Sequence, residues 1–132
     1  RRQRQMCIRD RNRVKFSLNP YNINRLTLKA GQAALEDTAY FDRTRAAIVD
    51  TRSWTKQQLE ARGFAVLDSR SNFLFASTDR KDGGTLYKEL KKNGILVRHF
   101  DAPRIANWLR ITIGTPEQMQ ALVETLDKIL EE

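Results

Sequence analysis

The spacing of hydrophobic positions divides the chain into two helical patterns followed by an alternation of short strands and helices. The turn-forming segment 19–24 ends at Asn24, which can cap a helix with apolar positions at Leu26, Leu28, Ala30, Ala33, Ala34 and Leu35. Asp37 and Thr38 open a second, longer helical pattern, and Gly63 stands where helices commonly end. We therefore expect two consecutive helices, the second long enough to connect two domains.

After Gly63 the hydrophobic period shortens to that of strands. Residues 64–67 and 72–76 predict two short strands joined by a polar turn, and residues 95–99 and 109–113 predict two more. Between these pairs, two adjacent glycines precede a helix that ends in a lysine-rich turn, a composition that favours a helix C-terminus.

The final helix has the clearest start signal in the chain. Thr115 is a predicted N-cap, Pro116 occupies the first helical position, and Gln118 completes a capping box. One apolar stripe follows, formed by Met119, Leu122, Val123, Leu126, Ile129 and Leu130. The complete order, two helices and then β-β-α-β-β-α, predicts an α+β fold with helices on one side of a mostly antiparallel sheet.

Composition limits the size of this fold and shows where its charge lies. The 132 residues are 40% hydrophobic, which suits one domain with a modest core. The formal net charge is +8, but residues 1–11 hold five arginines and one aspartate, so that +4 lies in this short head. The head could be a nucleic-acid arm, an organelle-targeting peptide or sequence foreign to the protein. We favour the last interpretation, because residues 5–11 resemble translated adaptor sequence.

Cysteine, histidine and hydropathy exclude several functional classes. Cys7 is the only cysteine, so no disulfide framework is expected, and the single histidine, His99, gives no basis for a metal site. No apolar run approaches the roughly 18–20 residues that span a bilayer. We expect a cytoplasmic protein that binds neither membranes nor metals.

Two arginines are the strongest candidates for chemistry. Arg98 and Arg110 each lie in an apolar, β-branched run that predicts a buried strand, where a guanidinium is rarely left without an anionic partner. A structural ion pair of Arg110 with Asp101 or a nearby glutamate is the alternative, as is an edge-strand Arg98 that reaches water. The functional interpretation is a site for an anionic small molecule.

Several segments, in unbroken order over about residues 12–130, resemble the C-terminal part of histidinol-phosphate aminotransferases. The resemblance rests on Asn12-Arg13-Val14-Lys15, Pro20-Tyr21-Asn22-Ile23-Asn24, Ala34-Leu35-Glu36-Asp37, Ser71-Asn72-Phe73-Leu74-Phe75, Gly94-Ile95-Leu96-Val97-Arg98 and Leu109-Arg110-Ile111-Thr112-Ile113-Gly114-Thr115. It implies the small domain of a fold-type I enzyme dependent on pyridoxal 5'-phosphate.

The resemblance also implies where the domains begin and end and which of them binds the cofactor. Residues 12–62 would link a large domain to a small domain formed by residues 63–132. The large domain would hold most of the cofactor contacts and supply the Schiff-base lysine. None of the eight lysines of this chain lies in the family's Ser-x-x-Lys-like setting. We therefore expect a fragment of a homodimeric aminotransferase, with no catalytic residue and no activity of its own.

Residue roles follow from the same resemblance. Arg110 would bind the α-carboxylate of glutamate and 2-oxoglutarate and, in the other half-reaction, help to hold the phosphate of histidinol phosphate. Arg98 would be its phosphate partner. Tyr21, Asn22 and Asn24 would lie near the dimer-related active site or simply form a turn and a cap. Asn72, similarly, would face the cofactor pocket or end a turn.

Three alternatives remain open from sequence. Threonine-phosphate decarboxylases and aromatic aminotransferases share much of this architecture, and fold alone does not separate substrates. A small basic RNA-binding domain is disfavoured, because Phe73-Leu74-Phe75 is not set among basic and glycine residues.

We also expect the isolated chain to associate through apolar surface around Tyr40, Phe41 and Trp54.

Overall fold

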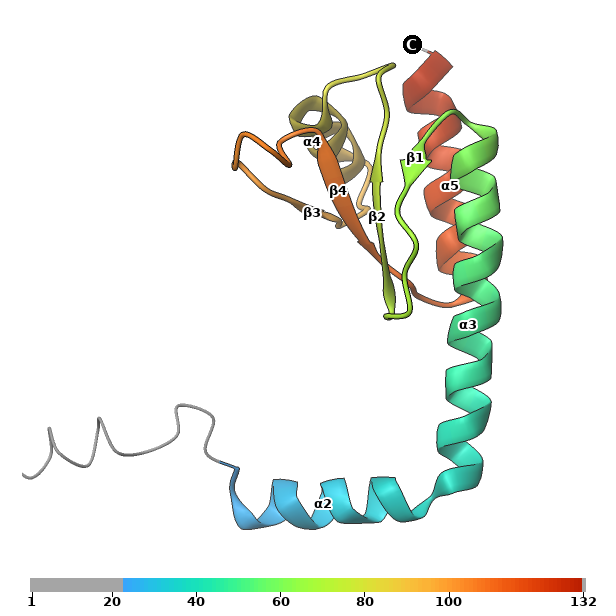
Figure 1. Cartoon of the computed structure of the whole chain (residues 1–132), viewed down its shortest axis with the longest axis vertical. Coiled ribbons are helices and arrows are strands. Elements are labelled where there is room, and N and C mark those ends of the chain that lie inside the picture. The colour runs from blue at the N-terminus through green and yellow to red at the C-terminus, as the bar shows by residue number, and fades with distance from the viewer. Residues whose placement is uncertain (1–22, 132) are drawn as a thin grey trace, which may run out of the picture. The chain divides into compact units, whose positions relative to one another are not determined.

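The computed structural model describes residues 23–131. The chain separates into two compact units, Arg1–Phe41 and Asp42–Glu132, and Figure 1 shows their elements. The predicted head, Tyr21 and Asn22 lie outside the described residues. The predicted boundary between a linking segment (residues 12–62) and a small domain (residues 63–132) refers to the intact protein, and it stays a prediction.

The first unit contains α2 (Arg25–Glu36) and the beginning of α3 (Thr38–Ala61). Asn24 caps α2 as predicted: its side-chain oxygen accepts a hydrogen bond of 2.9 Å from the backbone N–H of Thr27. No residue of α2 is buried. Its leucines are therefore left at the surface of this unit.

The long second helix is confirmed, and all of it from Asp42 onward belongs to the second unit. Asp37 accepts a hydrogen bond of 3.0 Å from the backbone N–H of Tyr40 at the start of α3. After Ala61 the chain turns at Gly63, whose φ of +81° is in the left-handed region that favours glycine. Toward this end Thr51, Thr55 and Leu59 are buried.

Four strands form one antiparallel sheet in the order β1-β2-β4-β3. The strands are β1 (Ala65–Val66), β2 (Phe73–Ser77), β3 (Arg98–His99) and β4 (Trp108–Thr112). Each predicted strand exists, so the α+β prediction and the antiparallel sheet are confirmed.

The third strand is much shorter than predicted, and Arg98 does not lie in a buried strand. The backbone N–H of Ile95 donates to the carbonyl of Leu90 at 2.9 Å, so this residue completes the C-terminal turn of the preceding helix. Ile95 and Val97 then bury their side chains partly against the core instead of joining the ladder. Pairing begins only at Arg98, which is exposed at the sheet edge.

Two further helices, α4 (Gly83–Lys92) and α5 (Pro116–Glu131), are capped by local sequence. Asp82 accepts a hydrogen bond of 2.9 Å from the backbone N–H of Thr85 at the start of α4. The predicted capping box of α5 forms: the Thr115 N–H donates to Gln118 Oε1 at 3.0 Å, and the Gln118 N–H donates to Thr115 Oγ1 at 3.4 Å.

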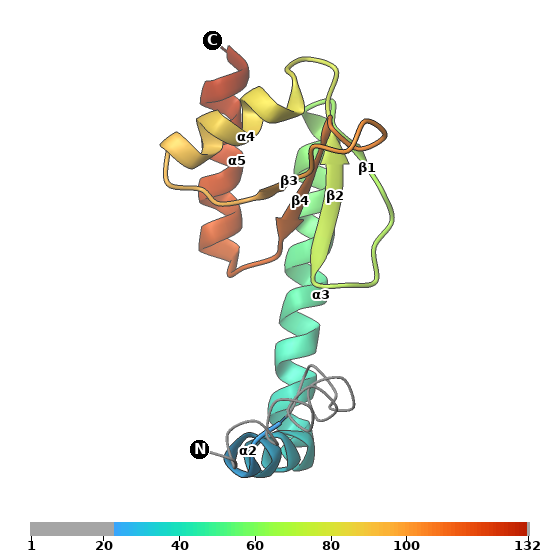
Figure 2. The same ribbon diagram turned by 90° about the vertical axis from the view of Figure 1, so that its left-hand side faces the viewer.

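Helices α3, α4 and α5 of the second unit cover one face of the sheet, as the two views in Figures 1 and 2 show. The core consists of alternate residues from β2 and β4 together with helix residues, namely Leu59, Phe64, Leu74, Ala76, Leu86, Leu90, Leu109, Ile111, Ile113, Met119, Leu122, Leu126 and Ile129. Because side chains alternate along a strand, the intervening residues point to the opposite face.

One side chain ties the loop between the last two strands to α4. Asn107 accepts a hydrogen bond of 2.6 Å from the N–H of Gly83 and donates one of 3.0 Å to the carbonyl of Thr78. A Cβ at Gly83 would lie 2.8 Å from the backbone of Asn107, so glycine is required for this approach. The contact fixes the start of β4.

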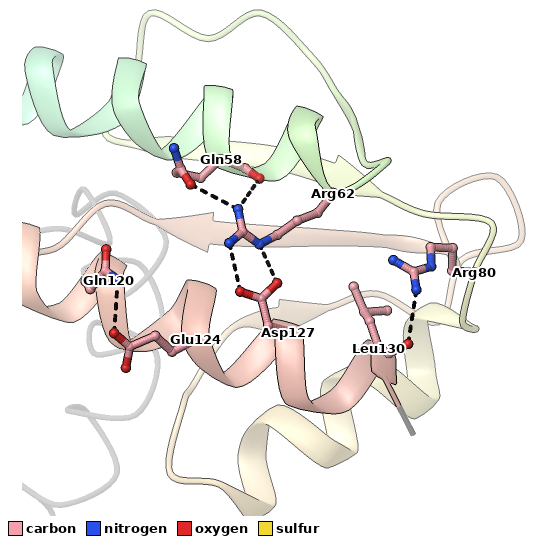
Figure 3. A network of polar contacts seen from close by, with 7 residues as sticks. All are labelled: Gln58, Arg62, Arg80, Gln120, Glu124, Asp127 and Leu130. Atoms are coloured by element: carbon pink, nitrogen blue, oxygen red, sulfur yellow. Dashed lines mark hydrogen bonds and ion pairs between the residues drawn. The ribbon is translucent and has the colours of Figure 1, made fainter.

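An ion pair joins Arg62, which directly follows the last residue of α3, to Asp127 of α5, 65 positions away (Figure 3). Arg62 donates from Nε to Asp127 Oδ1 at 2.6 Å and from Nη2 to Oδ2 at 2.8 Å. Its remaining nitrogen donates to the carbonyl and side-chain oxygens of Gln58. The hydrogen bonds from the guanidinium lower the pKa of Asp127 below its ordinary value.

Replacement of Asp127 with Asn should therefore have a pH-dependent effect on stability. The lowered pKa means that the carboxylate stabilises the folded state above about pH 4 and that this contribution disappears as the pH falls through the folded-state pKa. Because Asp127 is 42% exposed, we expect a loss of only about 0.5–1 kcal/mol at pH 7. Urea denaturation of the 132-residue chain at pH 7 and pH 3 measures it. Glu124→Gln, on the same helix, is the matched control, and a pH-independent loss in Asp127→Asn would contradict this account.

Exposed leucines on α2 should make the isolated chain associate. Leu28 and Leu35 are 62% and 78% exposed and, seven positions apart, lie on the same face of the helix. Contiguous apolar surface of this kind promotes association, so we expect the wild-type chain to elute above the monomer size in size-exclusion chromatography. The double variant Leu28→Gln/Leu35→Gln should shift toward the monomer. Leu96→Gln, at a similarly exposed leucine of the second unit, should change little. A strictly monomeric wild-type chain would refute the expectation.

Candidate functional site

The face of the sheet opposite the helices carries aromatic and basic side chains. Phe73 and Phe75 of β2 and Trp108 and Arg110 of β4 alternate with buried core residues, and all four are half-buried. Their half-burial leaves part of each side chain accessible on this face. We call this the arginine face, defined as Phe73, Phe75, Arg98, Phe100, Trp108 and Arg110.

The strand register brings the two predicted arginines together. Arg98 on β3 lies directly opposite Arg110 on β4, and Arg110 lies opposite Phe75 on β2, so one row crosses three strands. Directly opposed residues share a face, with Cα atoms about 4.5–5.5 Å apart. Arg110 is half-buried near the middle of the sheet, and Arg98 is exposed at its edge.

Each guanidinium lies over an aromatic ring. The Cζ atom of Arg110 is 5.5 Å from the ring centroid of Phe73, and that of Arg98 is 5.3 Å from the ring centroid of Phe100. Such cation–π contacts use the flat face of the guanidinium and leave its N–H donors at the edge free for hydrogen bonds.

Among residues 23–131, neither arginine has a carboxylate partner or a hydrogen-bond acceptor. Asp101, the partner that the sequence offers as an alternative for Arg110, lies instead 3.5 Å from Nδ1 of His99. The structural ion pair is therefore not formed. Two like charges directly opposite in a sheet are unfavourable unless an anion bridges them, and a guanidinium binds carboxylate or phosphate with paired hydrogen bonds.

The other predicted site residues are not brought to this face by any described contact. Asn24 caps α2 in the first unit. Asn72 is exposed; its backbone carbonyl accepts the N–H of Ile113 at 2.8 Å, and its side-chain oxygen accepts the hydroxyl of Ser71 at 3.3 Å. The Asn24 contact is that of a cap, whereas the Asn72 carbonyl continues the β2–β4 ladder by one residue. Tyr21 and Asn22 lie outside the described residues.

His99 points to the helix side of the sheet. Its Nε2–H donates to the carbonyl oxygen of Ala106 at 2.6 Å, and its ring stacks on Tyr87 with centroids 5.8 Å apart. In the part of the chain that the structure describes, no group of three histidine, cysteine or acidic side chains could hold a metal ion. Between Ile23 and Glu131, no helix is long and apolar enough to cross a membrane.

Sequence reasoning missed the aromatic members of the arginine face. Phe75 stacks on Trp108 with centroids 5.1 Å apart and meets Phe100 edge-on at 6.1 Å. The available signal was a spacing of two: Phe100 follows Arg98 and Arg110 follows Trp108 at the interval that places strand residues on one face.

The structure thus has a small antiparallel sheet with helices on one face. The other face carries two arginines that no described carboxylate pairs. The family comparison identifies the class: the chain belongs to the aminotransferase class I and II family, whose model matches residues 11–126.

Within this class the chain is similar to histidinol-phosphate aminotransferases. It is 49% identical over 119 residues to the one from Clostridium beijerinckii, covering 90% of this chain and 33% of that protein. It is 46% identical over 117 residues to the one from Chromohalobacter salexigens, covering 89% and 33%. The chain thus spans about a third of the length of the curated relatives it matches.

A solved structure shows that the fold is shared. The histidinol-phosphate aminotransferase from Sinorhizobium meliloti, solved in complex with pyridoxal-5'-phosphate, superposes with a TM-score of 0.76 at 22% identity, covering 89% of this chain and 33% of that one. The prediction of an aminotransferase small-domain fold is confirmed.

The lack of a carboxylate partner within residues 23–131 predicts how the arginines affect stability. Arg98→Gln and Arg110→Gln each lose a ring contact worth about 0.5–1 kcal/mol but also relieve like-charge repulsion of similar size, so we expect net changes within about 0.5 kcal/mol. Urea denaturation of the 132-residue chain at low and high salt measures both. Arg62→Gln, which breaks the pair with Asp127, is the comparison, and an equal or larger loss at Arg110 would show a structural role instead.

Proposed function

We propose that this chain is the C-terminal part of an aminotransferase that transfers an amino group between histidinol phosphate and 2-oxoglutarate. The carrying observation is the row of Arg98 and Arg110, two guanidiniums on one face of adjacent strands with no carboxylate partner in the described chain. The similarity to histidinol-phosphate aminotransferases over most of the chain supports the choice of substrates.

The two arginines differ in setting, and their proposed roles differ accordingly. Arg110, half-buried beside Phe75, would bind the α-carboxylate of glutamate and 2-oxoglutarate and also the phosphate of histidinol phosphate. Arg98, at the sheet edge, would add donors to the phosphate. A transaminase binds an amino donor and an acceptor in turn at one site, and the planar fork of a guanidinium suits both kinds of anion.

The arginine face fits a substrate anion better than it fits the cofactor. Its strands contribute no lysine, and the lysines with described ion pairs, Lys56 and Lys81, bind Asp68 and Glu89 elsewhere in the second unit. Pyridoxal 5'-phosphate, when bound, supplies the electron sink for amino transfer. In our proposal residues beyond this chain hold it, so the chain alone is inactive.

In our proposal the remaining predicted site residues lie at the edge of the active site. Tyr21, Asn22 and Asn24 would approach the active site of the partner in a homodimer, and Asn72 would border the cofactor pocket. The proposed enzyme works in the cytoplasm and uses neither nucleic acid nor a membrane.

A chimera tests the function directly. In it, residues 12–132 replace the matching part of the Clostridium beijerinckii relative, and amino transfer from histidinol phosphate to 2-oxoglutarate is measured. Arg98→Ala should raise the KM for histidinol phosphate about tenfold or more, since a lost charge-assisted hydrogen bond costs about 1.5–3 kcal/mol, and should change the KM for 2-oxoglutarate much less. Arg110→Ala should weaken both.

The matched control is Arg80→Ala, because the Arg80 guanidinium donates to the carbonyl of Leu130 at 3.1 Å near the end of α5 (Figure 3) and makes no described contact with the arginine face. Equal effects of Arg98→Ala on both substrates would count against a phosphate role. Release of carbon dioxide from a phosphorylated amino acid, without amino transfer, would instead identify a decarboxylase.

A further inference from the structure

Arg98 and Arg110 lie opposite each other in the sheet, but their side chains extend in opposite directions along the strands. Phe73, which stacks on the guanidinium of Arg110, lies opposite Thr112, two residues beyond Arg110 on β4. Phe100, which stacks on Arg98, lies two residues beyond Arg98, and the antiparallel pairing places it toward the Trp108 end of β4. The aromatic contacts therefore separate two charged groups whose backbones are neighbours.

The described contacts restrict the conformations of the two phenylalanine rings more than those of the two arginine side chains. Phe100 meets Phe75 edge-on at 6.1 Å, and Phe75 stacks on Trp108 at 5.1 Å, so Phe100 belongs to a three-ring cluster across β2 and β4. Phe73 is fixed in the ladder of β2, between the turn at Asn72 and the buried Leu74. Arginine side chains, by contrast, have many rotamers and, in the described residues, no acceptor that would select one.

This arrangement selects an arginine conformation without consuming a hydrogen bond. A carboxylate or carbonyl partner would orient each guanidinium but occupy its donors, whereas a ring occupies only its face. The N–H groups of Arg98 and Arg110 thus stay available to an anion, and less side-chain entropy is lost when the anion binds.

We propose that Phe73 and Phe100 are positioning residues that hold Arg110 and Arg98, respectively, apart and in the conformations that bind the anionic groups of the substrates. The inference rests on the proposed function of the two arginines. It assigns to each phenylalanine a separate effect, because each ring contacts a different guanidinium.

Kinetics of the chimera described above distinguish the two rings. Phe100→Leu should raise the KM for histidinol phosphate about two- to fivefold, the range of a lost cation–π contact, with the KM for 2-oxoglutarate and kcat nearly unchanged. Phe73→Leu should raise both KM values, because Arg110 serves both substrates. Phe100→Tyr and Phe73→Tyr retain the ring and should restore values close to those of the parent chimera.

Tyr87→Leu is the matched control. Tyr87 is also a half-buried ring near a cation, with Lys91 Nζ at 6.0 Å, but it lies on α4 and stacks on His99 on the helix side of the sheet. This variant should leave both KM values unchanged. Equal effects of Phe100→Leu on the two substrates, or failure of Phe100→Tyr to restore the KM, would overturn the proposal.

A binding measurement covers the case in which the leucine variants lose activity altogether. In the 132-residue chain, NMR signals of the Nε–H groups of Arg98 and Arg110 should shift on addition of inorganic phosphate. The apparent Kd should rise about two- to fivefold in Phe100→Leu and recover in Phe100→Tyr. An unchanged Kd in Phe100→Leu would overturn the proposal.

The arginine variants separate this inference from the proposed function. If Arg98→Ala and Arg110→Ala change the KM values as predicted and the phenylalanine variants do not, only the positioning role is wrong. If the arginine variants themselves have no effect, the proposed anion site is wrong and the positioning role falls with it.

Discussion

The structure of the second unit depends on the strict alternation of side chains along β2 and β4. Leu74, Ala76, Leu109 and Ile111 are almost completely buried against the helices, and this requires the residues between them to face the other way. A shift of register by one residue would bury Arg110 and expose the core leucines, a change that the hydrophobic effect opposes strongly. The same burial that stabilises the sheet therefore places the candidate site.

Charge placement follows from this constraint. Arg62 and Asp127 show how the protein uses an arginine to connect two helices, because the pair is bidentate, joins α3 to α5 and lowers the pKa of the carboxyl group. Arg110 has no such partner among residues 23–131 and lies instead against the flat face of Phe73. The contrast between these half-buried arginines of one small unit is the physical basis for assigning an external anion to Arg110.

Family membership and the structure answer different questions about function. The match to class I and II aminotransferases identifies the enzyme class, while the chain spans about a third of its relatives. Fold similarity does not choose a substrate. Our proposal for the substrate therefore rests on local chemistry: Arg98 and Arg110 lie on one face of the sheet, and each guanidinium lies over a different aromatic ring.

Local signals in the sequence determined the helices and their ends. Asn24, Gly63 and the capping box of Thr115 and Gln118 act through bonds within a few residues, so their outcome can be predicted without knowing the fold. The candidates Arg98 and Arg110 could likewise be named from their apolar surroundings and family resemblance. Only the tertiary structure decided that the segment before Arg98 closes α4 instead of extending β3, that Asp101 does not pair with Arg110, and that Phe73 and Phe100 lie against the two guanidiniums. The contact of Phe73 with Arg110 joins two strands and is set by sheet register, which a linear pattern does not contain. The other contacts are local, and which of them forms depends on how the segment between α4 and β4 packs against the rest of the unit.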